Sequence, residues 1–489
     1  MTATLVVAIC LLSTFTLSTP VRPDRVFDPA AASSALTPDA GGPVGDALPV
    51  DGAATGVAGV GDPGAPAATA GTVQSASGGV RSGTKVYDCA KGQNAGATEI
   101  GVTAKQIRFA ATIVKTGIAK DFLADAQLGM EAVRQKVNRA GGICGRTLAI
   151  DYKDDGWDPT TGQRIIESFI GEKKYFGLAV NPSSEGLRGP IDSGLIKANK
   201  FPVIGADGQL VNQYRDPWVW PVATSTASTM HVMAHDAVQR GAKKVGIVWE
   251  QNYRFGVEGH AAFVKAVERA GGTVVADIAL QGGQTDYGNQ VNDFISKCGG
   301  QDKLDQCEFI AMLLEPTTAS QWVRNGGLGN GTVRPKIGIG APQPLFIDSF
   351  ARDCGAQCAG MWVWTSFKPP IDPFDTEPAV STYRADLAAV SATADANNPH
   401  VQGAYLGMLL LVDALKKLGP APTREGIKAV LDATKLDAGI APALDFKPGN
   451  HFSATSVQAF KAVVNNGSFT SWRFTGRGFI ADPDVGKDV

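Results

Sequence analysis

The chain has 489 residues and a formal net charge of −2, and 44% of its residues are hydrophobic. A near-neutral chain without a basic stretch lacks the positive surface that nucleic acid or an anionic membrane attracts, so we exclude both as partners of the folded part. At about 150 residues per domain the length allows roughly three units, and beyond the N-terminus no apolar run reaches the ~20 residues that span a bilayer.

The N-terminal segment has the pattern of an export signal. Residues 5–17 form an apolar run that has the length of a signal-peptide core and is short for a membrane span. We expect residues 1–19 to be a signal peptide or an anchor, which would provide the one membrane contact of an extracytoplasmic protein. Cys10 is either a lipid-acceptor cysteine or a cysteine inside a cleaved signal. Residues 20–97 are rich in Ala, Gly and Pro, so we expect a disordered linker.

From about residue 98 onward, apolar runs alternate with helical patterns. Residues 107–114 and 147–152 have the composition of buried strands. Between them, an apolar stripe at helical spacing runs from Ala126 to Val137, and Gly141 ends the helix. This alternation predicts an α/β fold with a doubly wound parallel sheet, covered by helices on both faces.

The same pattern begins again near residue 244, and short segments recur in the same order 125 to 144 residues apart. The recurring pairs are VNRAGG and VERAGG, ESFI and NDFI, NPSS and EPTT, PVIGAD and KIGIGAP, and WVW twice. A period this long exceeds that of solenoid repeats. We therefore expect two similar lobes joined by a hinge: residues 98–222 with part of 368–450, and residues 223–367 with part of 451–489. The chain must then cross between the lobes more than once.

Two of the recurring segments, NPSS and EPTT, directly follow buried strands. Ligands of doubly wound sheets bind beyond the carboxyl ends of the strands, so we expect both turns to face one cleft between the lobes. Asn181, Ser183 and Ser184, with the N–H groups of the following helix, suit an anionic oxygen, and Glu315 suits a positive ligand group. The alternatives are that the hydroxyl groups only cap helices and that Glu315 is a solvated loop residue.

Neighbouring strand-end turns supply further candidate ligand-binding residues. Ala206 and Asp207 follow a strand, among small residues that let the backbone approach a ligand. Tyr253 and Phe255 follow the first strand of the second lobe, and clefts are commonly lined by aromatic residues. The remaining candidates are Gln343 and, at the expected cleft rim, Trp157. For the aromatic residues, ordinary packing is the alternative.

Six further cysteines form an even set behind an export signal, which predicts disulfides. They are Cys89, Cys144, Cys298, Cys307, Cys354 and Cys358. Short loops favour Cys298–Cys307 and Cys354–Cys358, which leaves Cys89–Cys144. The competing interpretation is a zinc site that includes Cys354 and Cys358, but no neighbouring histidine completes a ligand set. We expect neither a metal nor a cofactor.

Several segments together resemble the type I periplasmic binding proteins, and among them the leucine/isoleucine/valine-binding branch. They are YKDDGWDP, AVNPSSEG, FPVIGAD, VWEQNYRFGVEG, QTDYGNQV and LLEPTTASQW, which occur in that family's order within residues 98–476. The resemblance implies a receptor without enzymatic activity, whose hinged lobes close on a small polar solute such as an amino acid, an amide or a carboxylate, with an ABC permease as a candidate partner. It also implies that Ser183, Ser184 and Ala206 would hold a carboxylate. The family's acidic residue for an ammonium falls near GAPQP, which has no carboxylate, and Glu315 is the nearest substitute.

Two other functions fit parts of the sequence. An enzyme is one: His231 and His235 lie four residues apart on one helix face, but the first lacks the Glu that follows it in zinc proteases. Neither a nucleophile elbow nor a phosphate-binding loop is present. A ligand-sensing surface protein without a transport role is the other, since the same pocket would serve it.

Overall fold

The structure is a computed structural model that describes residues 81–82 and 94–488, except 330 and 332. These residues belong to one compact unit, Gln74–Val489. The expected signal or anchor at 1–19, Cys10, Cys89 and most of the expected linker lie outside the described residues. Within the described part of the chain, no helix is both long and apolar enough to cross a bilayer.

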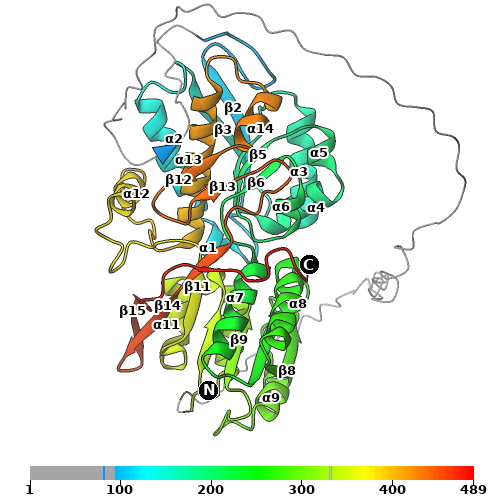
Figure 1. Ribbon diagram of the computed structural model, residues 1–489, viewed down its shortest axis with the longest axis vertical. Helices are drawn as coiled ribbons and strands as arrows, with labels where there is room; N and C mark the ends of the chain where they lie inside the picture. The colour runs from blue at the N-terminus through cyan, green and yellow to red at the C-terminus, as the bar shows by residue number, and fades with distance from the viewer. Residues whose placement is uncertain (1–80, 83–93, 330, 332, 489) are drawn as a thin grey trace, which may run out of the picture. The chain divides into compact units, whose positions relative to one another are not determined.

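The first lobe is built on a parallel sheet with the strand order β3-β2-β4-β5-β6 (Figure 1). The strands are β2 (Gln106–Ile113), β3 (Thr147–Asp154), β4 (Leu178–Asn181), β5 (Val203–Ala206) and β6 (Val219–Pro221). The helices are α1 (Lys120–Leu123), α2 (Ala126–Arg139), α3 (Pro159–Gly171), α4 (Ser184–Asp192), α5 (Leu195–Ala198) and α6 (Asn212–Arg215). Helix α3 starts soon after β3 because Asp158 accepts a hydrogen bond from the Thr161 N–H at 2.7 Å and Pro159 occupies the first helical position.

The second lobe repeats this arrangement and adds antiparallel strands, in the order β15-β14-β11-β10-β9-β7-β8. The parallel strands are β7 (Lys244–Glu250), β8 (Thr273–Leu280), β9 (Phe309–Leu313), β10 (Gly338–Ala341) and β11 (Trp362–Thr365). The helices are α7 (Thr226–Gln239), α8 (Arg254–Arg269), α9 (Gly288–Lys297), α10 (Pro316–Arg324), α11 (Asp348–Cys354), η1 (Gln343–Leu345) and η2 (Gly355–Cys358). The antiparallel strands are β14 (Ser456–Asn465), β15 (Ser468–Phe474) and β16 (Ile480–Ala481).

The expected all-parallel pattern therefore fails at one edge of the second sheet. Asn466 and Gly467 both have positive φ, 50° and 80°, which matches the twist of a tight hairpin and turns β14 back as β15. Apart from that edge, the predicted α/β fold with two similar sheets is confirmed.

The C-terminal part of the chain returns to the first lobe before it forms that hairpin. It contains α12 (Pro378–Ala388), α13 (Pro399–Leu418), α14 (Arg424–Leu431), β12 (Lys435–Asp437) and β13 (Leu444–Asp445). Strand β12 pairs with β13 on one side and with β1 (Arg81–Ser82) on the other. Helix α13 packs on α2, β4 and β5 (Figure 1). Helix α13 approaches β5 so closely that a Cβ added to Gly205 would lie 2.5 Å from Gly407 Cα. The described chain thus passes between the sheets after β6, after β11 and before β14, and the three connections form a hinge.

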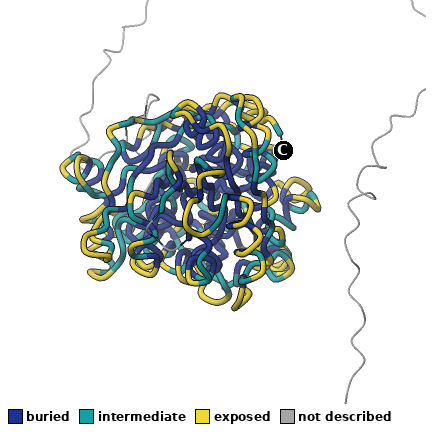
Figure 2. Tube along the Cα trace, turned by 90° about the horizontal axis from the view of Figure 1, so that it is seen from below, coloured by how far each residue is buried: buried dark blue, intermediate teal, exposed yellow. Residues whose placement is uncertain are grey.

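Buried residues fill the interior of the folded unit, and exposed segments lie mainly in loops at its periphery (Figure 2). The repeated WVW segments place Trp220 and Trp364 in the core, where both are fully buried. The predicted Cys298–Cys307 and Cys354–Cys358 disulfides are present. Cys144 is also disulfide-bonded.

Candidate functional site

The NPSS turn of the first lobe is held by its own polar side chains. Asn181 Nδ2 donates to Thr112 Oγ1 on β2 at 2.6 Å, and Asn181 Oδ1 accepts from the Ser183 N–H at 3.0 Å. Ser183 is the N-cap of α4, because its hydroxyl accepts from the Gly186 N–H at 3.3 Å. Asn181 and Ser183 therefore shape the turn, and Ser184 is the first helical residue.

Asp155, at the end of β3, joins this turn. Its Oδ1 accepts hydrogen bonds from Ser183 Oγ at 2.8 Å and from the Trp157 N–H at 2.9 Å, while its Oδ2 has no partner. Burial raises the pKa of Asp155 to about 6, because a charged carboxylate loses its hydration there. Asp155 therefore releases its proton closer to neutral pH than an exposed aspartate does.

Trp157 lies at the centre of an aromatic group that joins the lobes. Its indole Nε1 donates to Ser184 Oγ at 3.2 Å. Its ring centroid lies 4.6 Å from that of Tyr253 and 5.7 Å from that of Phe255, and Phe122 approaches edge-on at 5.9 Å. The expected position at the cleft rim is therefore wrong: Trp157 is 5% exposed because aromatic residues of both lobes cover it.

The EPTT turn of the second lobe is capped by its acidic residue. Glu315 is the N-cap of α10 and accepts from the N–H groups of Thr317 at 2.7 Å and Thr318 at 2.5 Å. The alternative of a solvated loop glutamate is wrong, because Glu315 is fully buried. The hydroxyl groups of Thr317 and Thr318 do not cap α10. The carboxylate does, and it also lines the space between the lobes.

Glu250, at the end of β7, is a second buried carboxyl beside Glu315. Its Oε2 accepts from the Glu315 N–H at 3.2 Å, and its Oε1 has no partner. Burial, followed by the charge of Glu315, raises the pKa of Glu250 well above its usual range. Burial also raises the pKa of Glu315. Ionising one of these adjoining carboxyls therefore makes ionising the other more costly.

The GADG turn supplies a further acidic group, Asp207, which lines the space between the lobes. Ala206 is the last residue of β5 and pairs with Asn181 in the sheet. Asp207 follows it and accepts from Gln213 Nε2 at 2.8 Å, and burial raises its pKa to about 7. Gln343, at the start of η1, accepts from Thr365 Oγ1 at 3.0 Å.

Polar contacts fix the two lobes to each other beside this space. Glu185 on α4 accepts from the Arg254 N–H at the start of α8, at 2.7 Å. Arg254 in turn pairs with Asp192 of the first lobe at 2.5 Å, and Glu258 accepts from the Val211 N–H at 2.9 Å. A carboxylate of one lobe therefore caps a helix of the other, where the helix dipole favours a negative charge.

The cavity between the lobes is small in this arrangement, about 10 Å³, which is room for about one water. The predicted site residues that line it are Trp157, Ser184, Asp207, Phe255 and Glu315. Asn181 and Gln343 line an adjoining space, which shares Asp207 and His400 with the first. Ser183, Ala206 and Tyr253 line neither space, and the Tyr253 ring packs against Trp157 at a tilt of 33°.

Sequence reasoning missed Phe122, His400, Asp155 and Glu250 as residues around the cleft. Phe122 and His400 lie on α1 and α13 and carry no strand-end pattern, so no local signal marks them. Asp155 and Glu250 end strands, and the rule that selected Asp207 would also have selected them.

The histidine pair that suggested a metal has other partners. His231 Nδ1 lies 3.1 Å from Asp482 Oδ2, and His235 Nε2 lies 2.9 Å from Asp484 Oδ2. The C-terminal residues 482–488, red in Figure 1, run beside α7 and α8 and are held there by these contacts. Among the described residues, no group of three or more His, Cys, Asp or Glu is arranged to hold a metal.

Two doubly wound sheets, connected three times and meeting at a cleft lined from both lobes, define a two-lobed binding protein of type I. The family model described as "Periplasmic binding protein" matches residues 106–467, so the chain belongs to that family, and the resemblance seen in the sequence is confirmed. No curated protein matches the chain at a significant level.

Solved structures agree on the fold. The fatty acid ABC transporter substrate-binding protein from Thermomonospora curvata is 17% identical, with a TM-score of 0.64, over 80% of this chain and 96% of that one. A solute-binding protein from R. palustris in complex with benzoate is 14% identical, with a TM-score of 0.63, over 78% and 100%. The branched-chain amino acid transporter substrate-binding protein from Streptococcus pneumoniae, in complex with isoleucine, is 16% identical, with a TM-score of 0.61, over 76% and 99%.

Proposed function

We propose that this protein is an extracytoplasmic receptor that closes its two lobes on a small polar solute and delivers it to an ABC importer. The observation that carries the proposal is the cavity between the lobes, because strand-end turns of both lobes line it through Ser184, Asp207 and Glu315. Relatives of the same fold bear names that include fatty acid, benzoate and isoleucine, so the fold leaves the solute open.

The proposed mechanism is a shift of population between open and closed arrangements. The contacts of Glu185 with α8 and of Arg254 with Asp192 exist only when the lobes meet. A solute that touches both lobes binds the closed arrangement better and therefore raises its population. The cavity holds about one water, so the lobes must part, or Trp157 and Phe122 must move, before a solute enters.

A thermal-shift screen followed by calorimetry tests the proposal. A solute that binds only the folded protein stabilises it by RT ln(1 + [L]/Kd), so a specific binder raises Tm in a dose-dependent manner. The panel contains amino acids, amides, amines, carboxylates and sugars. If no compound raises Tm, the receptor proposal loses its support. Crosslinking in cells separates import from the alternative of ligand sensing, since only import requires a permease partner.

A further inference from the structure

Acidic groups from both lobes lie at or beside the cleft, and two of them, Asp207 and Glu315, line its cavity. Asp155 and Asp207 come from the first lobe, and Glu250 and Glu315 come from the second. Burial raises the pKa of all four, so the protein pays a desolvation cost to hold them there. None of the described residues that line the cavity is Lys or Arg. Arg188 on α4 and Arg254 on α8 pair with Glu185, Asp192 and Glu258.

The donor groups that would hold a ligand carboxylate are already used by the chain. At the start of α4, the Ser183 N–H donates to Asn181 Oδ1 and the Gly186 N–H donates to Ser183 Oγ. The Ser184 N–H faces the Asp207 carboxylate and favours its ionised form. At the start of α10, Glu315 takes the free N–H groups. A ligand carboxylate would have to displace these oxygens and add negative charge to a cleft without a cation.

Among the described residues, three buried polar atoms around the cleft lack a hydrogen-bond partner. They are Asp155 Oδ2, Glu250 Oε1 and His400 Nε2. His400 is 5% exposed and lines both the cavity and the adjoining space. Burial lowers the pKa of His400 to about 3, so its ring is neutral and able to accept a hydrogen bond. A buried acceptor is normally satisfied, and a ligand N–H group in the cavity would satisfy His400 Nε2.

Aromatic rings complete the lining. Phe122, Trp157 and Phe255 border the same cavity as Glu315 and Asp207. Ring faces attract a cation, and they also cover an apolar body. The cleft therefore offers carboxylates, unpartnered acceptors and aromatic surface together.

We propose that the solute is a small primary amine with an apolar body and no carboxylate. The inference rests on the proposed receptor function and narrows its ligand to a class outside the amino acids, amides and carboxylates that the family resemblance suggests. The ammonium lies among Asp207, Glu315 and His400, and its apolar body packs against Trp157 and Phe255. Its positive charge favours ionisation of carboxyls that burial otherwise holds protonated, so the amine promotes closure.

The test uses matched compounds that share one apolar body: 3-methylbutylamine, leucine and 4-methylpentanoate, and likewise 2-phenylethylamine, phenylalanine and 3-phenylpropanoate. Calorimetry and thermal shift on the full chain should show binding of at least one amine and no binding of its matched acid. If an acid or an amino acid binds and the amines do not, the amine inference is wrong while the receptor function stands. If no amine binds, the inference is also wrong, and the wider panel then decides the receptor function separately.

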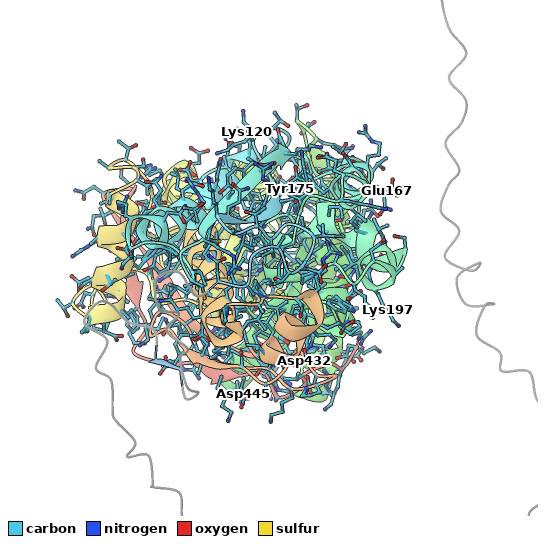
Figure 3. All side chains as sticks on the ribbon, turned by 90° about the horizontal axis from the view of Figure 1, so that it is seen from above. Lys120, Glu167, Tyr175, Lys197, Asp432 and Asp445 are labelled. Atoms are coloured by element: carbon cyan, nitrogen blue, oxygen red, sulfur yellow. A yellow bond between two sulfur atoms is a disulfide. The ribbon has the colours of Figure 1, made fainter. Side chains whose placement is uncertain are left out.

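Substitutions of the cleft carboxylates test where the ammonium of the amine binds. Asp207→Asn should weaken amine binding about tenfold or more, since a charged hydrogen bond contributes about 1.5–3 kcal/mol, and Glu315→Gln is the second variant if Asp207→Asn does not fold. Glu167→Gln is the matched control, because Glu167 is an exposed carboxylate of α3 that lies toward the edge of the first lobe in Figure 3. An unchanged affinity in both cleft variants would overturn the placement of the ammonium.

Discussion

Replacing Asp207 by Asn should make the protein more stable near pH 7.5 and less sensitive to pH. The folded pKa of Asp207 is about 7, against an ordinary value of 3.8, because the carboxyl is buried. Between these two pH values the folded state holds a proton that the unfolded state has released. Stability therefore falls as pH rises through this window, by about 1.4 kcal/mol per pH unit for one such group. Over about three pH units the loss of folding stability reaches about 4 kcal/mol, and Asn does not incur this loss because its side chain does not ionise.

Chemical denaturation at half-unit steps from pH 4.5 to 8 measures this effect. The wild-type free energy of unfolding should decline across the range, and Asp207→Asn should reduce the decline while keeping an oxygen for Gln213 Nε2 to donate to. Glu167→Gln should follow the wild type, since its carboxylate is exposed. The reasoning is refuted if Asp207→Asn is less stable than the wild type at pH 7.5 with an unchanged slope, because the carboxylate would then be ionised at no cost.

Three further predictions concern parts of the fold outside Asp207. Glu185→Gln removes the charge that caps α8 across the lobes, so the radius of gyration from solution scattering should increase; an unchanged radius would contradict this role. Burial alone would raise the pKa of Asp484, but hydrogen bonds from the side chains of Lys487, His235 and Arg269 together lower it. Its stabilisation should therefore be lost as pH falls below about 4, and Asp484→Asn should show less acid sensitivity than the wild type in thermal melts. Replacing Cys298 and Cys307 together by Ser should cost about 2–3 kcal/mol in urea unfolding, and a cost near zero would show that the bridge does not restrain the unfolded chain.

The duplicated architecture could be predicted from the sequence because both lobes contain the same local strand–turn–helix pattern. A buried strand that ends in a turn and enters a helix needs a capping residue, and NPSS and EPTT meet that need at corresponding places. The identity of each cap could not be predicted. Ser183 caps α4 through its hydroxyl, whereas Glu315 caps α10 through its carboxylate, and both choices fit the local pattern.

The burial of the site residues could not be predicted either, since it depends on residues from distant segments. Glu315 is buried because Glu250 and the facing lobe surround it, and Trp157 is buried because Tyr253 and Phe255 cover it. His400 reaches the cleft only because α13 returns from the second lobe to pack on β5. Contacts of this kind are set by the topology, which the local pattern specifies only in outline.

The most direct test of the central claim is the distance between the lobes with and without solute. Donor and acceptor fluorophores at Glu167→Cys on α3 and Lys265→Cys on α8 would report it by single-molecule energy transfer, since both positions are exposed and belong to different lobes. The compound that raises Tm most in the screen should increase the population with high energy transfer in proportion to occupancy. Saturating binding with no change in that population would contradict closure of the two lobes on a solute.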